Sequence, residues 1–131
     1  MIEIAVSTGA RTDFVDVTRQ VQAAVTELDL VDGAVAVFNP HTTAGVTINE
    51  GADPDVVRDL DLILDRVVPW SGGYRHAEGN AAAHAKATMT GSSVTVLVEA
   101  GRLVLGTWQK IFYCEFDGPR SRKFFVKAFN C

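Results

Sequence analysis

Two groups of short strand-like segments, one on each side of a helical middle, constrain the fold of this chain most strongly. Residues 2–6 alternate apolar and polar side chains, as half-buried strands do. In the last third, similar segments are separated only by Ala100-Gly101 and Asp117-Gly118-Pro119, which are short enough for hairpin turns. Strands joined in this way favour an α+β fold over a wound parallel sheet. We expect two packed antiparallel sheets, arranged as a β-sandwich or as barrel-like sheets, with two to three helices outside them.

The expected elements can be placed along the chain. Thr18 is suited to cap a first helix, Asp53 and Pro54 to begin a second, and Asn80 to cap a third. The alternating and compact apolar segments predict strands, the last four of them as an antiparallel meander, at residues 2–6, 14–17, 34–38, 44–48, 94–99, 102–105, 110–116 and 122–129.

Length and composition predict one globular domain over residues 1–131, because 47% of the residues are hydrophobic and 21% are charged. A net charge of −4 gives no reason to expect nucleic acid as a partner, and no apolar run is long enough to span a membrane. The first residues lack the pattern of a signal peptide. Cys114 and Cys131 fit reduced thiols better than a disulfide, which would need an ordered last residue. We therefore expect a cytoplasmic protein.

Three polar blocks interrupt the apolar pattern and contain all three histidines. They read HTTAGVTINEGADPDV from residue 41, HAEGNAAAHAKATMTGSS from residue 76 and LGTWQKIFYCEFDGPRSRKF from residue 105. In order and spacing they resemble the signature blocks of the YjbQ-like family, which is described as a family of secondary thiamine-phosphate synthases. The resemblance runs from about residue 2 to residue 129.

This resemblance implies an α+β sandwich that assembles as a homotrimer. It also implies a transferase that joins a pyrimidine pyrophosphate to a thiazole phosphate, so that the partner is a small phosphorylated molecule. The sequence lacks the G-x-S-x-G and G-x-G-x-x-G motifs of many hydrolases and dinucleotide-dependent enzymes.

The histidines are candidate catalytic residues and metal ligands. Asn80 and His84 are four residues apart and share one helix face, His76 precedes that helix, and His41 lies on a strand connection. Three imidazoles in one pocket would suit a divalent metal such as zinc, magnesium or manganese, with water at an open position. The alternative is that these side chains only form hydrogen bonds at the ends of helices and strands.

Other polar residues of the blocks are further candidates. Glu50, Glu115 and Asp117 are candidate general bases or metal partners, although Asp117 also fits a turn and Glu50 also fits a solvated position. The Gln109 amide is suited to read ring nitrogens, and Trp108 is suited either to stack on a flat ring or to fill the core.

Three basic residues are candidates for phosphate binding: Lys86, Arg120 and Arg122. The planar guanidinium matches pairs of phosphate oxygens. The leading hypothesis is therefore a transferase on phosphorylated heterocycles. The alternatives are a metal-dependent hydrolase of an unidentified substrate and a non-catalytic small-molecule binding protein.

Assembly has modest support from the C-terminal strand. Phe124 and Phe125 must lie on opposite faces of that strand, so one of them has to face a helix, a second sheet or another subunit. We expect the three blocks to meet near a subunit contact, with Arg120 or Arg122 close to the pocket of a neighbouring subunit.

Overall fold

The structure is a computed structural model that describes residues 1–131. Its elements follow in the order β1 (Ile2–Ser7), β2 (Asp13–Asp16), α1 (Thr18–Glu27), β3 (Gly33–Phe38), β4 (Ala44–Glu50), α2 (Pro54–Val67), α3 (Ala81–Thr90), β5 (Ser93–Glu99), β6 (Arg102–Leu103), β7 (Gln109–Glu115) and β8 (Ser121–Asn130).

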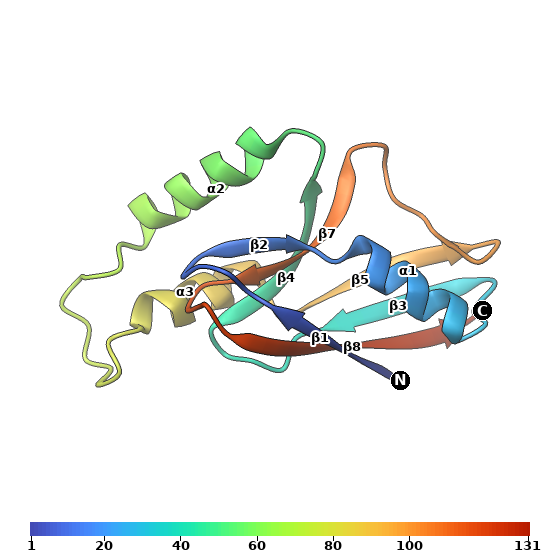
Figure 1. Cartoon of the computed structure of the whole chain (residues 1–131), viewed down its shortest axis with the longest axis horizontal. Helices are drawn as coiled ribbons and strands as arrows, with labels where there is room; N and C mark the ends of the chain where they lie inside the picture. The colour runs from blue at the N-terminus through green and yellow to red at the C-terminus, as the bar shows by residue number, and fades with distance from the viewer.

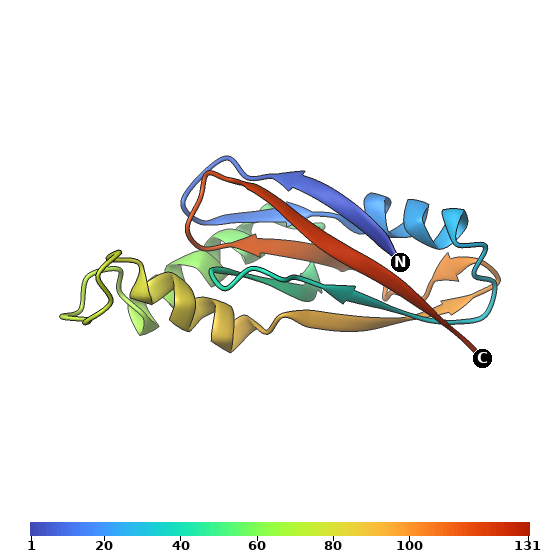
Figure 2. The same ribbon diagram turned by 90° about the horizontal axis from the view of Figure 1, so that it is seen from below.

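The strands form two antiparallel sheets with helices outside them (Figures 1 and 2). One sheet has the order β1-β8-β3-β5-β6, and the other has the order β2-β7-β4. Every strand pair is antiparallel. The expected α+β class, with antiparallel sheets and three helices, is confirmed.

The expected C-terminal meander is wrong. Only β5 and β6 pair as sequence neighbours, while β7 joins β2 and β4 in the smaller sheet, and β8 lies between β1 and β3 in the larger one. The alternating pattern identified the strands, but it does not determine their partners. β7 is buried on both of its faces, because Ile111 and Tyr113 lie in the main core while Phe112 and Cys114 lie in a second cluster.

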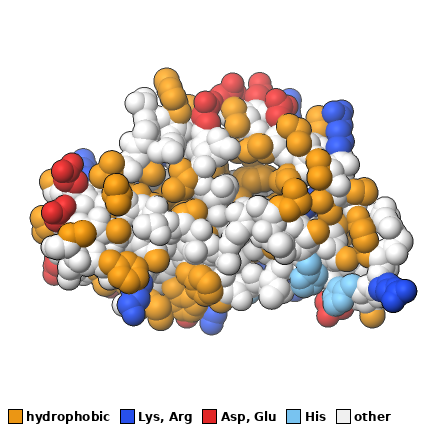
Figure 3. Space-filling model, turned by 180° about the vertical axis from the view of Figure 1, so that it is seen from behind, with side chains coloured by type: hydrophobic (Ala, Val, Ile, Leu, Met, Phe, Trp, Pro, Cys, Tyr) orange, Lys and Arg blue, Asp and Glu red, His pale blue; other side chains and the backbone are white.

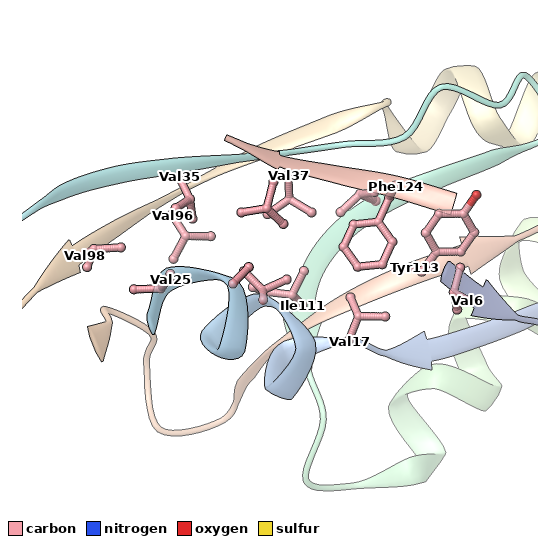
Figure 4. Packing of buried hydrophobic residues seen from close by; sticks show 14 of the residues in the cluster. Val6, Val17, Val25, Val35, Val37, Val96, Val98, Ile111, Tyr113 and Phe124 are labelled. Carbon is pink, nitrogen blue, oxygen red and sulfur yellow. The ribbon is translucent and has the colours of Figure 1, made fainter. Parts of the chain in front are cut away.

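The main core lies between the sheets and α1 (Figure 4). Valines at alternate positions of β3 and β5 point into it, as does one face of α1, and the fully or nearly fully buried members include Val21, Val25, Val35, Val37, Val96 and Val98. Phe124 is fully buried there, whereas Phe125 is half-buried on the opposite face of β8, as strand geometry requires.

The three helix starts differ in their capping. Asp53 caps α2 as expected, because its Oδ1 accepts the backbone N–H of Asp55 at 2.9 Å. The cap expected from Thr18 is wrong, since Thr18 is already helical and its hydroxyl accepts the Ile111 N–H at 2.9 Å, which ties α1 to β7. Asn80 occupies the cap position of α3, but its side chain does not cap the helix, because the amide nitrogen donates a hydrogen bond to Asp117.

Helix α2 stands away from the sheets and has no fully buried residue (Figure 1). Val57 and Leu64 pack against the second cluster, while Leu62, Ile63 and Val67 are largely exposed. None of the helices is long and apolar enough to cross a membrane. Both cysteines are free, Cys114 in the core and Cys131 on the surface.

Candidate functional site

A polar cavity of about 390 Å³ lies where the β3–β4 connection, the start of α3 and the β7–β8 turn come together. We call it the histidine pocket, and it is lined by Pro40, His41, Thr42, Thr43, His76, Glu78, Asn80, His84, Arg120 and Arg122. Histidine side chains gather at one end of the face shown in Figure 3. The structure thus brings together all three histidines with both candidate arginines and Asn80.

An ion pair beneath this pocket holds Arg122 in place. Glu115 is completely buried, and its two oxygens accept hydrogen bonds from Arg122, with 2.8 Å between Oε1 and Nε. The Thr8 hydroxyl and the Asp117 N–H also donate to this carboxylate, at 2.8 and 3.0 Å. Burial alone would raise the pKa of Glu115, but these donors, led by Arg122, lower it. Glu115 is therefore ionised and fully engaged, which suits it to support the site rather than to take a proton from a substrate.

Arg122 faces the pocket from this anchored position. Its Nη2 also donates to the Thr43 hydroxyl at 2.7 Å, and the residue is 8% exposed. Its pKa is raised, mainly by the hydrogen bonds to Glu115. The remaining Nη1 makes no hydrogen bond within the chain, so it is available to an anion in the pocket.

His41 has a defined tautomer. Its Nε2 accepts the backbone N–H of Lys123 at 3.1 Å, so the ring hydrogen of the neutral imidazole lies on Nδ1. Burial, followed by the charge of Arg122, lowers the pKa of His41. At neutral pH this side chain is therefore an uncharged hydrogen-bond donor.

Asp117 connects two other pocket residues. Its Oδ2 accepts the Asn80 amide at 2.8 Å and the Arg120 guanidinium at 2.9 Å. Because a carboxylate only accepts hydrogen bonds, these contacts fix the Asn80 amide with its nitrogen toward Asp117. Asn80 is only 6% exposed, and its buried Oδ1 has no hydrogen-bond partner within the chain. Asp117 therefore orients both residues in addition to forming the expected turn.

The three histidines do not come together as a set of metal ligands. His76 and His84 meet edge to face, with 5.1 Å between ring centroids, and both line the pocket. His41 lines it too, but its Nε2 is occupied by the Lys123 N–H. No group of three His, Cys, Asp or Glu side chains lies close enough to hold a metal. The expected metal thus stays a prediction, and the donor set does not fit a three-histidine site in this arrangement.

Four candidates lie away from the histidine pocket. Lys86 is 2% exposed and points toward α2, where its ammonium group is paired with Asp65. Glu50 and Gln109 are partners in the β4–β7 register, at the end of these strands farthest from Glu115. Trp108 is 62% exposed, so it does not fill the core of this chain.

Sequence reasoning missed three contributors: Thr8, Thr43 and Glu78. Thr8 holds the buried carboxylate, Thr43 holds Arg122, and Glu78 is the only carboxylate in the pocket lining. Thr43 and Glu78 lie inside the quoted blocks, so proximity to a histidine was an available signal. Thr8 lies outside every block, and its role depends on the distant pairing of β1 with β8.

Two further cavities are relevant to the chemistry. A cavity of about 460 Å³ adjoins the histidine pocket, shares His41 and His84 with it, and adds the Phe38 ring. The largest cavity, about 700 Å³, lies beside α1 and is lined in part by Arg19, Arg102 and Lys110.

Comparisons with known proteins agree with this fold. The family model described as UPF0047 protein YjbQ-like matches residues 2–131. The UPF0047 protein YugU of Bacillus subtilis is 50% identical over 125 residues, which cover 95% of each chain. The crystal structure of an uncharacterised YjbQ/UPF0047 protein from Clostridium acetobutylicum is similar with a TM-score of 0.97 and 53% identity, covering 98% of this chain and 100% of that one. The TT1486 structure from Thermus thermophilus gives a TM-score of 0.92 at 43% identity, with coverage of 98% and 100%.

Proposed function

The chain belongs to the YjbQ-like UPF0047 family, and from the geometry of the histidine pocket we propose that it binds the phosphate or pyrophosphate group of a small molecule there and acts as a transferase on that molecule.

One observation carries this proposal, namely the composition of the pocket lining. It contains three histidines and two arginines but only one carboxylate, Glu78, and its one apolar side chain is Pro40. The start of α3 adjoins the pocket, because Asn80 lines the pocket and directly precedes that helix. Helix N-termini and guanidinium groups both favour phosphate oxygens. A pocket with these properties selects an anion.

The adjoining cavity supports a heterocycle as the other part of the ligand. Phe38 and Ala87 give its wall an apolar portion, whereas Pro40 is the only apolar side chain in the histidine pocket. An aromatic ring and a charged group need these two kinds of surroundings. His41 and His84 line both cavities, so a single ligand is able to occupy both at once.

The reaction implied by the family resemblance fits this arrangement. A ring nitrogen of the thiazole forms a bond to the carbon that carries the pyrophosphate, and the carbon–oxygen bond breaks with both electrons leaving on the pyrophosphate. Negative charge therefore grows on the departing group in the transition state. Arg122 and the Nδ1–H of His41 are fixed donors that would stabilise this charge without reorganising.

The test is a direct assay of the purified protein with both thiamine precursors and a divalent metal. We expect thiamine phosphate from the wild-type protein and a much lower yield from His84→Ala. No product above the level of this variant would contradict the transferase. Metal analysis after dialysis tests the alternative of a metal-dependent hydrolase, because that enzyme requires about one bound metal per chain to activate water.

A further inference from the structure

Two histidine rings in the histidine pocket are not engaged by the rest of the chain. The rings of His76 and His84 meet edge to face, with 5.1 Å between their centroids, and neither ring takes part in a hydrogen bond within the chain. The His41 ring differs, because its Nε2 accepts the Lys123 N–H. A neutral imidazole has one nitrogen with a lone pair in the ring plane. On His76 and His84 this lone pair is therefore available to a ligand, whereas on His41 it is occupied.

His84 is the more firmly placed of these two free rings. It lies in α3 on the same face as Asn80, and both residues line the histidine pocket. A neighbouring face of the helix is buried in the second cluster through Ala83 and Ala87, and this packing fixes the rotation of the helix. His76 is exposed and lies in the connection before the helix. The His84 ring is therefore held at a defined place in the pocket wall.

Donors for the oxygens of a phosphoryl group line the same pocket. The Arg122 guanidinium is paired with Glu115, and the Arg120 guanidinium is paired with Asp117. The arginines therefore supply directed N–H groups rather than excess positive charge. The Nη1 of Arg122 makes no hydrogen bond within the chain, and the Nδ1–H of His41 is a further donor. Because the fold holds these donors before a ligand binds, they are suited to stabilise the charge of a phosphoryl group during transfer.

We propose that His84 is a nucleophile that accepts a phosphoryl group from a phosphate ester or anhydride whose leaving group departs as a stable anion. The lone pair of the free ring nitrogen attacks phosphorus, and the bond to the leaving oxygen breaks with both electrons remaining on that oxygen. Glu78 is the only carboxylate of the lining and is exposed, so no buried acid is placed to protonate a poorer leaving group. The inference rests on the proposed function only in taking this pocket as the phosphate site.

Water completes the reaction. It attacks the phosphorus of the phosphorylated ring, the phosphorus–nitrogen bond breaks with its electrons returning to the His84 ring, and inorganic phosphate leaves. The proton of the water passes to His76, whose ring lies against that of His84. The net reaction is hydrolysis of the phosphate ester or anhydride, so this activity breaks a phosphorus–oxygen bond, whereas the proposed transferase breaks a carbon–oxygen bond.

The first test uses p-nitrophenyl phosphate, because its leaving group departs as a stable coloured anion. We expect wild type to release p-nitrophenolate and His84→Gln to release it about a hundredfold more slowly. The matched control is Arg66→Ala, an exposed position on α2 outside the pocket lining, and it should keep the rate within about twofold of wild type.

Two further variants test the covalent step itself. His76→Gln should slow the attack of water, so that a phosphoryl group accumulates on His84. Mass spectrometry after an alkaline quench locates this group, because phosphohistidine is stable to alkali and labile to acid. In His84→Ala, added imidazole should restore the release of p-nitrophenolate, since the free base takes the place of the missing ring. This rescue also shows that the variant is folded.

Three results would overturn the proposal: no release by wild type, release at the wild-type rate by His84→Gln, or no phosphoryl group on His84 in His76→Gln. Pyrophosphate binding without any phosphorylation of His84 refutes this inference and leaves the proposed function intact. Phosphorylation of His84 without formation of thiamine phosphate from both precursors refutes the proposed transferase alone.

Discussion

Arg122 and Glu115 form a two-point ion pair beneath the histidine pocket, with 2.8 Å between Nε and Oε1 and a second bond from Nη2 to Oε2. Glu115 is completely buried, and Arg122 is 8% exposed. The pair links the stability of the domain to the position of the guanidinium that faces the ligand.

Removal of one partner of this ion pair should lower the stability of the domain strongly. Glu115→Gln leaves Arg122 charged and without its counter-ion, so we expect the free energy of unfolding at pH 7 to fall by about 3–5 kcal/mol. Chemical denaturation measures this change. Glu3→Gln is the matched control, because Glu3 is exposed and 3.7 Å from the Lys123 ammonium, and it should change stability by about 0.5 kcal/mol or less.

The same ion pair should make the free energy of unfolding sensitive to acid. The pKa of Glu115 is lowered in the folded state from its ordinary value of 4.5. Its contribution is therefore complete above about pH 4.5 and is lost as the pH falls through the lower folded pKa. Glu115→Gln should flatten the decline of stability below pH 4.5. An identical decline in wild type and variant would show that Glu115 is not held by Arg122 in solution.

His41 should take up a proton when an anion binds. Its pKa is lowered in the free pocket, mainly by burial and then by Arg122, and a bound dianion would raise it. The proton would enter at Nε2, so the ring would give up the hydrogen bond from the Lys123 N–H. Sulfate is a suitable probe because it does not titrate near neutrality. Calorimetry at about pH 6.5 in buffers of different ionisation enthalpy should reveal proton uptake that is smaller in His41→Gln. Equal uptake in both proteins would assign the proton to another group.

Asn80 should tolerate no added charge. Asn80→Asp places a second carboxylate 2.8 Å from Asp117 and next to the bound anion. We expect pyrophosphate affinity to fall by about tenfold or more, since like charges at such distances repel strongly. Asn130→Asp, an exposed position with the same change of net charge, should leave the affinity unchanged. Similar losses in both variants would indicate a general effect of charge.

Lys86 should matter for stability and not for phosphate. Lys86→Met removes a buried ammonium group from Asp65, which is itself half-exposed, so we expect a loss of about 1–2 kcal/mol, between the values for buried and exposed pairs. Pyrophosphate affinity, measured by calorimetry on the folded variant, should stay within about twofold of wild type. A tenfold loss of pyrophosphate affinity would show that Lys86 does take part in phosphate binding.

The position of Lys86 was open to prediction from helix geometry. Residues four apart, such as Asn80 and His84, share a face, and both do line the pocket. Lys86 is two residues after His84 and therefore lies on the far side of the helix. There it meets α2, an element whose place no local pattern reveals. The resemblance in sequence grouped these residues as one block, but the helix separates them.

The strands show a similar division between local and distant information. The opposite faces of Phe124 and Phe125 on β8 were predicted correctly, because this feature depends only on neighbours in sequence. The pairing of β7 with β2 and β4 depends on which faces the two sheets bury, and turn lengths carry no such information. Gln109 lies far from His41 for this reason, although the quoted blocks place both in the candidate site.

Calorimetric titration with pyrophosphate is the most direct test of the histidine pocket as an anion site. We compare wild type with Arg120→Ala, in the pocket, and Arg102→Ala, in the larger cavity beside α1. We expect binding to wild type, a loss of about tenfold or more in affinity for Arg120→Ala, and a change within about twofold for Arg102→Ala. No binding at millimolar pyrophosphate, or a loss confined to Arg102→Ala, would contradict it.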